Sequence, residues 1–229
     1  MSSKSGSATM RLPTVTEIEP ATDFMSLPEA STKIVRVNDH FAVKMGHGVS
    51  LIEAENMKFL AAYSKVPVPK VHAAFRDPAT NKAYFIMQCV PGETLEAILP
   101  SLNMARRAIV CKVLKDAITE LRTLPPPDSL GMLNRTPCLD GVFWIRGLTE
   151  SEPYINLVRN MVNQTLKNHR TVFAHDWEGA GWYPDFWDSC NATIACRFKP
   201  DWLELVPGIL EQYPVEFLMM QVVYSSVFY

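Results

Sequence analysis

Four short stretches of the chain carry residue types that could bind a phosphate-bearing ligand. The first is Phe41-Ala42-Val43-Lys44. It is typical of a strand, so alternate side chains share a face and Ala42 and Lys44 point the same way. A small side chain two residues before a lysine leaves room for a flat ring, while the ammonium group reaches phosphates beyond that ring. A lysine on the solvent face of an edge hairpin is the alternative interpretation of the same residues.

A lysine that binds phosphate needs a carboxylate to hold it, and the second stretch offers two. Glu53 and Glu55 both stand in the helix that is predicted to follow. Glu53 also completes Ser50-Leu51-Ile52-Glu53, which fits the S-x-x-E capping box, in which the glutamate folds back on the start of the helix. A carboxylate committed to that cap cannot also hold Lys44. We therefore expect Glu53 as the partner of Lys44, with Glu55 in its place if Glu53 caps the helix.

The third stretch is YFIMQCVPG, residues 84–92, a strand that runs into Pro-Gly. Such a strand could present the backbone N–H and C=O groups of Met87, Gln88 and Val90 to a purine. A buried strand followed by a turn is the alternative.

The fourth stretch is DWEGAGWYP, residues 176–184, which begins directly after an apolar strand. Its first residue, Asp176, could bind Mg²⁺, a hard cation that prefers carboxylate oxygen. A solvated or capping aspartate is the alternative there.

The part of the chain before residue 92 has the pattern of a small antiparallel sheet. Four β-type runs occur in two pairs, and each pair flanks a turn-forming stretch and predicts a hairpin. The runs are 34–37 with 41–44, and 71–75 with 83–90. A helix from Ser50 to about Tyr63 is expected between the two hairpins.

The rest of the chain has helical periodicity. A long helix is expected after the capping residue Asn103, with an apolar face from Met104 to Leu121, and three prolines at 125–127 would stop it. Another helix is expected after Ser151. The whole pattern predicts an α+β protein with a disordered tail at 1–20, a β-rich lobe and hinge at 21–92, and a helical lobe at 93–229.

Composition narrows the classes of protein. The 229 residues are 48% hydrophobic and 20% charged, with a net charge of −2, so no basic field favours nucleic acid as a partner. No apolar run reaches the roughly 18–20 residues that a membrane span needs, and the Ser-rich N-terminus does not have the apolar core of a secretory signal. Five scattered cysteines fit reduced thiols, so we expect a cytoplasmic protein without a membrane partner.

The four stretches, in this order, resemble the aminoglycoside phosphotransferase and choline kinase-like family, particularly its fungal members. The resemblance covers about residues 33–215 and is carried by FAVK, GVSLIEAENMKFL, VPVPKV, YFIMQCVPGETL, LDGVFW and DWEGAGWYPDFW. It implies a protein-kinase-like fold of two lobes, ATP and Mg²⁺ as cofactors, and a hydroxyl group of a small molecule as the phosphate acceptor. The fungal likeness points to secondary metabolism.

The resemblance also implies roles for single residues. Lys44 matches the phosphate-binding lysine and Glu53 its helix partner. Met87, Gln88 and Val90 match the hinge beside the adenine, and Ala42 lies where the ring would rest. Asp176 matches the magnesium ligand.

The chain departs from the family pattern at one junction. The family places H-G-D-x-x-x-x-N, which supplies the catalytic base and a second metal ligand, after the strand that resembles 171–175. A hairpin then leads to the metal-binding aspartate. Here His175 is followed at once by Asp176, and H-x-D-x-x-x-x-N occurs nowhere in the sequence. The catalytic loop and the following hairpin are therefore missing, and no catalytic residue is assigned. Because a hairpin returns the chain near its start, we expect the fold to close across the gap.

Three functions remain open on this evidence. A pseudokinase-like binding protein would use the old cleft for a nucleotide, a hydroxyl-bearing metabolite or a protein partner, with ATP binding weakened or lost. An active phosphotransferase would rely on positioning and on metal and lysine electrostatics. A different biosynthetic enzyme would use His175, Asp176 and Glu178 for acid–base chemistry. A gene sequence read without the exon for the catalytic loop would produce the same junction.

Overall fold

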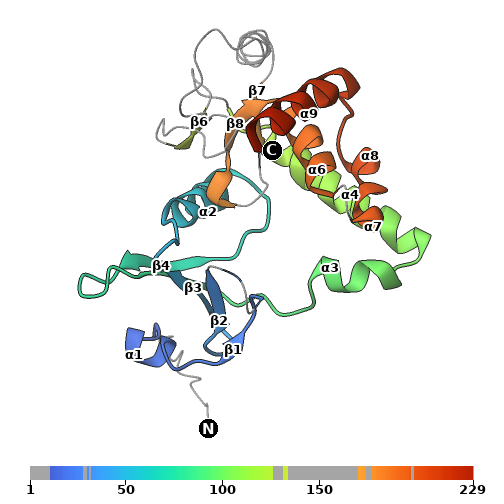
Figure 1. The fold of residues 1–229 in the computed structure, drawn as a ribbon. Helices are drawn as coiled ribbons and strands as arrows, with labels where there is room; N and C mark the ends of the chain where they lie inside the picture. Colours follow the sequence, from blue (N-terminus) through green and yellow to red (C-terminus); the bar gives the residue numbers. More distant parts are fainter. Residues whose placement is uncertain are drawn as a thin grey trace, which may run out of the picture. The chain divides into compact units, whose positions relative to one another are not determined.

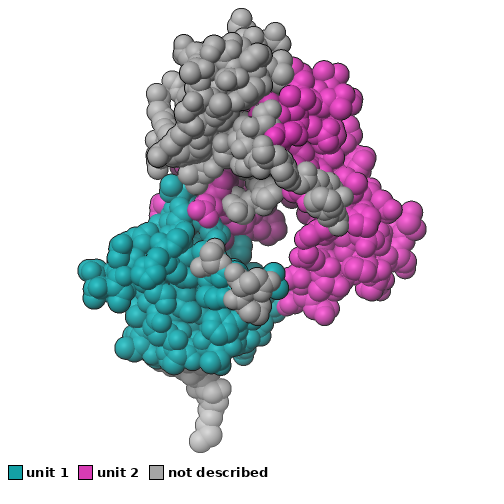
Figure 2. Space-filling model, in the orientation of Figure 1, with its two compact units in different colours: residues 1–54, 69–91 teal, residues 55–68, 92–229 magenta. Residues whose placement is uncertain are grey.

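The computed structural model describes residues 11–27, 30, 32–125, 131–133, 170–173, 177–196 and 199–228. The chain divides into two compact units, coloured teal and magenta in Figure 2. The first unit holds residues 1–54 and 69–91, and the second holds residues 55–68 and 92–229. The sequence placed the whole of 21–92 in one lobe, whereas the structure assigns 55–68 to the second unit, because Phe59 and Leu60 pack there against Trp182.

The first unit is built on a five-stranded antiparallel sheet with the strand order β1-β2-β3-β5-β4 (Figure 1). The strands are β1 Asp23–Phe24, β2 Lys33–Arg36, β3 Phe41–Gly46, β4 Val71–Arg76 and β5 Ala83–Gln88. Both predicted hairpins, β2–β3 and β4–β5, are confirmed.

Short polar side chains close the turns of these hairpins. Asn38 Oδ1 accepts hydrogen bonds from the backbone N–H groups of His40 at 2.9 Å and Phe41 at 3.0 Å. Asp77 does the same for Ala79 and Thr80 in the other turn, at 3.3 and 3.2 Å. A side chain that bonds its own backbone a few residues ahead favours a turn over a continued strand. These turns therefore follow from local sequence.

One face of the sheet packs against a short N-terminal helix, α1 Val15–Ile18. Ile18 is fully buried in this apolar cluster. The buried members from the sheet are Val35, Phe41, Val43, Met45, Tyr84 and Ile86. The sequence predicts a disordered tail at 1–20, whereas the structure describes residues 11–20 and places Val15–Ile18 in a helix whose Ile18 is buried.

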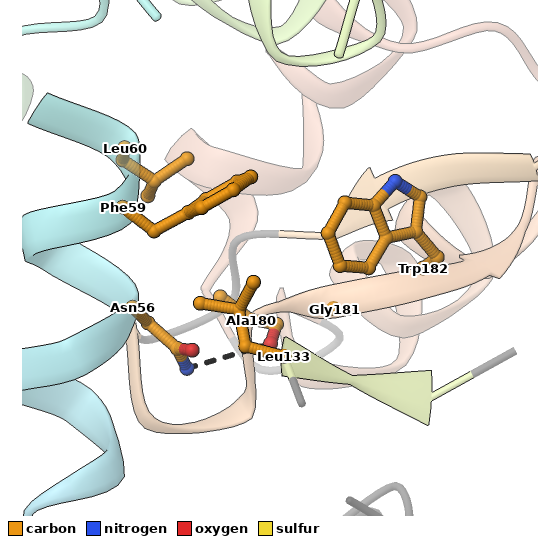
Figure 3. Close-up of a pocket in the computed structure, with 7 residues that line it drawn as sticks. All are labelled: Asn56, Phe59, Leu60, Leu133, Ala180, Gly181 and Trp182. Atoms are coloured by element: carbon orange, nitrogen blue, oxygen red, sulfur yellow. Dashed lines mark hydrogen bonds between the residues drawn. The ribbon is translucent and has the colours of Figure 1, made fainter. Parts of the chain in front are cut away.

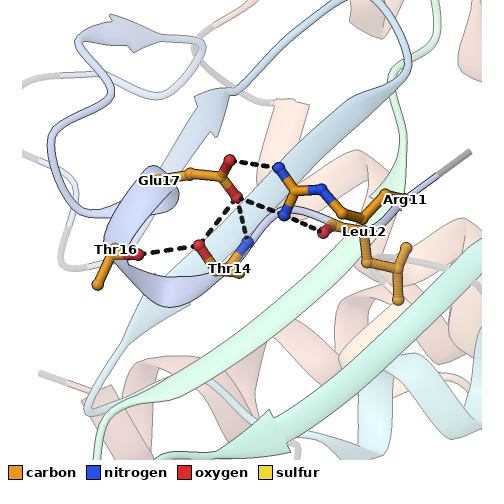
Figure 4. A network of polar contacts seen from close by, with 5 residues as sticks. All are labelled: Arg11, Leu12, Thr14, Thr16 and Glu17. Atoms are coloured by element: carbon orange, nitrogen blue, oxygen red, sulfur yellow. Dashed lines mark hydrogen bonds and ion pairs between the residues drawn. The ribbon is translucent and has the colours of Figure 1, made fainter.

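A local polar network fixes the start of α1 (Figure 4). Arg11 donates to both carboxylate oxygens of Glu17, at 2.5 and 3.1 Å, and the backbone N–H of Thr14 donates to the same carboxylate at 2.8 Å. The Arg11 hydrogen bond, together with those from Thr14, lowers the pKa of Glu17 to about 2. The carboxylate thus stays ionised at the positive end of the helix.

The second unit contains a small three-stranded sheet and most of the helices. Its strands lie in the order β6-β8-β7, with β6 Gly131–Met132, β7 Arg170–Phe173 and β8 Gly181–Pro184. Its helices are α3 Leu95–Ile98, α4 Met104–Leu121, α6 Trp187–Cys196, α7 Pro200–Leu203, α8 Val206–Ile209 and α9 Pro214–Phe228. Helix α2, Ile52–Tyr63, begins in the first unit and continues in the second. A small antiparallel sheet and a helical region are the predicted fold class, which is confirmed.

Helix α4 begins and ends close to where the sequence predicts. Asn103 Oδ1 accepts from the backbone N–H of Arg106 at 3.0 Å, as an N-cap does. The predicted apolar face is buried only toward the C-terminal end, since Leu121 is 3% exposed and Met104 is 83% exposed. Periodicity alone could not show that Met104, the first residue of α4, stays exposed.

The strands on either side of the junction pair with each other. β7 and β8 are antiparallel neighbours, with Thr171 opposite Tyr183 and Phe173 opposite Gly181. The strands on the two sides of the junction are thus neighbours in one sheet. His175, Asp176 and the helix predicted after Ser151 lie outside the described residues.

The core of the second unit centres on aromatic residues after the junction. Trp187 is fully buried and its ring stacks on that of Tyr183 at 5.6 Å between centroids. Phe186, Cys190, Met220 and Val223 complete this cluster. Among the described helices, none combines the length and apolar character that crossing a bilayer would require.

Candidate nucleotide site

The first unit brings Lys44 and Glu53 together. Lys44 Nζ on β3 donates to Glu53 Oε2 on the first turn of α2 at 2.5 Å, and the two side chains are only 13% and 11% exposed. Ser50 Oγ accepts from the backbone N–H of Ile52 at 3.3 Å, so the serine supports the helix start while the glutamate reaches the lysine. Glu55 pairs with Lys58 on an exposed part of the helix instead.

The burial of this ion pair indicates what it does. Taking two charges out of water costs about as much as their attraction returns, so such pairs add little net stability. They do hold a charged group in one orientation. Here the pair holds the Lys44 ammonium at a fixed place beside the sheet.

The strand register places flat, apolar surface next to Lys44. Residues directly opposite each other in neighbouring strands share a face. Ala42 is opposite Met87, and Lys44 is opposite Phe85, so all four side chains lie on the face that does not pack against α1. Ile34 on β2 is opposite Lys44 and belongs to the same face. The sequence alone does not predict that Ile34 lies on this face, because only the register of β2 against β3 places it opposite Lys44.

The hinge residues differ in what their backbone can offer. The Gln88 N–H donates to the Lys70 carbonyl at 2.8 Å, and the Cys89 N–H donates to the His40 carbonyl at 2.9 Å. Val90 is 55% exposed, and its N–H makes no hydrogen bond with any described residue. Of these three backbone donors, the structure thus leaves only that of Val90 available to a ligand.

Gln88 is therefore a poor candidate for a direct contact. Its backbone N–H is bonded to Lys70, and its side-chain oxygen accepts from the N–H of Lys70 at 3.3 Å. Alternation along β5 also places its side chain on the face opposite to that of Met87. The sequence treated residues 87–90 as one group, and the pairing of Lys70 with Gln88 separates them.

The predicted metal ligand, Asp176, lies outside the described residues. Within the part of the chain that is described, no three His, Cys, Asp or Glu side chains are grouped so as to hold a metal ion. The residues after Asp176 are described and form a single turn, Trp177–Gly179, that leads into β8.

Comparison with solved structures identifies the fold. The crystal structure of aminoglycoside phosphotransferase APH(4)-Ia matches with a TM-score of 0.52 and 11% identity, over 93% of this chain and 96% of that one. A thermostable mutant of the same enzyme, in a ternary complex with AMP-PNP and hygromycin B, matches with a TM-score of 0.50 and 11% identity, over 90% and 86%. A mutant of aminoglycoside 2'-phosphotransferase-IIIa in its GDP complex matches with a TM-score of 0.50 and 13% identity, over 90% and 82%.

These likenesses show that the chain has the kinase-like fold of the aminoglycoside phosphotransferases. No protein-family model matches the chain, and no curated protein matches it in sequence. At such low identity the shared property is the fold, and the residues of the site must carry any argument about activity.

Proposed function

We propose that this protein is a kinase-fold nucleotide-binding protein of pseudokinase type, which binds ATP with Mg²⁺ but transfers phosphate poorly or not at all. The observation that carries the binding part is the Lys44–Glu53 pair, held at 2.5 Å and largely buried. In a kinase-like fold, a lysine on this strand paired with a glutamate of the next helix holds the phosphates of the nucleotide.

The rest of the sheet face fits a purine nucleotide. Ala42 is small and lies two residues, or about 6.6 Å, before Lys44 along the strand. That separation leaves space for a sugar between a ring resting on Ala42 and phosphates at Lys44. Ile34 and Met87 would flank the ring, and the free N–H of Val90 would bond its edge. The ammonium of Lys44 would neutralise phosphate oxygens, and Asp176 is the proposed ligand for the magnesium ion that accompanies them.

The impairment follows from the sequence at the junction. A general base contributes about 10²–10⁴-fold to a rate, and the sequence has no H-x-D-x-x-x-x-N to supply one. Asp176 cannot serve both as metal ligand and as base. The direct pairing of β7 with β8 supports a chain that closes without the missing segment.

If phosphate transfer is lost, a second ligand that binds to the helical unit would be recognised without being phosphorylated. One matching structure holds hygromycin B, a hydroxyl-bearing small molecule, together with a nucleotide analogue. We propose a hydroxyl-bearing metabolite as the second ligand, with a protein partner as the alternative.

Thermal unfolding with and without nucleotide tests the binding part. A ligand at 100 times its Kd stabilises a protein by about 2.7 kcal/mol, which raises Tm clearly. We expect a rise with Mg-ATP in the wild type and none in Lys44→Ala. Lys58→Ala is the matched control, because Lys58 is an exposed lysine of α2 whose pair with Glu55 lies on the surface. No shift with any nucleotide would refute binding.

Turnover of ATP with a panel of hydroxyl-bearing metabolites tests the impairment. Working kinases typically turn over about 1–100 times per second. We expect rates lower by several orders of magnitude. A rate within the ordinary range, abolished by Lys44→Ala, would refute the impairment and indicate an active phosphotransferase.

A further inference from the structure

The cavity beside Asn56, in the second unit, is too small to be a ligand site. Its lining is mostly apolar, from Phe59 and Trp182 among others, and it measures about 10 Å³ (Figure 3). That is about the volume that a single water needs. Asn56 itself is 1% exposed, and its Nδ2 donates to the carbonyls of Trp177 at 2.6 Å and Ala180 at 3.4 Å. The asparagine thus anchors the turn that leads into β8.

The sheet face proposed to hold the ring of the nucleotide carries a charged pair, and all of it belongs to the first unit. Arg36 on β2 lies directly opposite Ala42 on β3, and Asp23 on β1 lies directly opposite Arg36. Met87 on β5 lies on the other side of Ala42. Residues opposite each other in neighbouring strands share a face, so these four side chains form one row. Val35, the neighbour of Arg36 along β2, is buried on the other face, against α1.

The guanidinium of Arg36 is held on this face and remains available to a ligand. Its Nε lies 3.5 Å from Asp23 Oδ2, and the two side chains are 42% and 63% exposed. An ion pair this exposed adds little to stability. Neither Nη1 nor Nη2 of Arg36 makes a hydrogen bond with any residue that the structure describes. Asp23 therefore orients the side chain and leaves both terminal nitrogens as donors.

The place of Arg36 in the row decides which part of a base it can reach. A ring that rests on Ala42 lies above β3, and the strands on either side are about 4.8 Å away. Side chains that rise from those strands, Arg36 from β2 and Met87 from β5, would meet the edges of the ring and not its flat face. The thioether of Met87 is a weak acceptor, whereas the guanidinium of Arg36 donates and cannot accept. Arg36 thus suits an edge of the base that carries an acceptor.

Purines carry acceptors of this kind, because N7 and N3 are ring nitrogens that accept hydrogen bonds. We infer that Arg36 is a specificity residue of the proposed nucleotide site, which donates to N7 or N3 of the purine at the edge beside β2. This inference rests on the function proposed above. The free N–H of Val90 follows β5 and so approaches the ring from the side opposite to Arg36.

Nucleotide analogues that lack one ring nitrogen test this contact. 7-Deaza-ATP has a C–H group in place of N7, and 3-deaza-ATP has one in place of N3. We expect at least one of them to bind the wild type about tenfold more weakly than ATP, as fits the loss of a hydrogen bond from a charged donor. In Arg36→Met that deficit should vanish, because ATP itself has lost the same bond. Calorimetric titration with each nucleotide and Mg²⁺ gives the dissociation constants.

Arg11→Met is the matched control. Arg11 is also an exposed arginine of the first unit paired with a carboxylate, that of Glu17, but it lies beside α1, which packs on the opposite face of the sheet. Its dissociation constants for all three nucleotides should equal those of the wild type. Arg36→Ala serves if Arg36→Met does not fold.

The outcomes separate the two proposals. Measurable ATP binding without a deficit for either analogue would refute the contact of Arg36 with the base and leave nucleotide binding in place. A deficit that persists in Arg36→Met would refute it as well, even if that variant binds all three nucleotides more weakly, because the arginine would then act through the charge of the phosphates. No binding of any nucleotide by the wild type would refute the proposed function and, with it, the role of Arg36.

Discussion

Asp188 should make the protein less stable as the pH rises from acid to neutral. This carboxylate lies in the first turn of α6, and one of its oxygens accepts from Arg122 Nη2 at 3.3 Å. Burial raises the pKa of Asp188 to about 6, against the opposing effect of the Arg122 charge. The perturbation is Asp188→Asn, which keeps the size of the side chain and removes its titration.

The sign follows from proton binding. Between the unfolded pKa of 3.8 and the folded pKa of about 6, the folded state holds a proton on Asp188 that the unfolded state has released. The resulting stability is fully present below the unfolded pKa and is lost as pH rises through the folded pKa. One pKa unit corresponds to about 1.36 kcal/mol, and the linkage relation then predicts a loss of about 2 kcal/mol between pH 4.5 and pH 7.

Urea unfolding of wild type and Asp188→Asn at a series of pH values measures this loss. Other carboxylates titrate in both proteins and cancel in the difference between their free energies of unfolding. The free energy of unfolding of the wild type minus that of Asp188→Asn should fall by about 2 kcal/mol from pH 4.5 to pH 7. A difference that stays level, or one that grows with pH, would refute the reasoning. Arg122→Gln should lower the free energy of unfolding at neutral pH, because it takes away the ionic partner of the buried Asp188 carboxylate.

Two further substitutions test packing and capping. Gly181→Ala should disrupt the β6–β8 pairing, because an added Cβ would lie 2.7 Å from the carbonyl oxygen of Gly131. Its control is Gly208→Ala, whose Cβ would meet only the Cys111 side chain at an ordinary 3.5 Å, so thermal unfolding should show a large loss in the first variant and none in the second. Asn103→Ala should lower stability by about 1 kcal/mol through loss of the α4 cap, measured by urea unfolding, and a change below a few tenths would show that the cap is not needed.

Much of the fold was predictable because it is set locally. The hairpins follow from β-type runs on either side of turn residues such as Asn38 and Asp77, whose side chains bond backbone groups two or three positions away. The start of α4 follows from Asn103 in the same way. The exposure of Met104 was not predictable, because it depends on what a distant part of the chain brings to that turn.

The candidate site shows the same division. Lys44 and Ala42 were placed on one face by strand alternation alone. The competition for Glu53 between Ser50 and Lys44 could not be decided locally, since both partners are consistent with the sequence. The meeting of β3 with α2 decided it in favour of Lys44.

What the sequence by itself determined is the set of elements, their turns and caps, and the junction between His175 and Asp176, because each depends on neighbours along the chain. Only the tertiary structure decided that Glu53 holds Lys44, that Gln88 is tied to Lys70, that Ile34 joins the sheet face, and that Asn56 anchors the turn at Trp177. A hydrogen bond between groups tens of residues apart requires strand register and helix packing to bring them within about 3 Å. No local pattern encodes that distance.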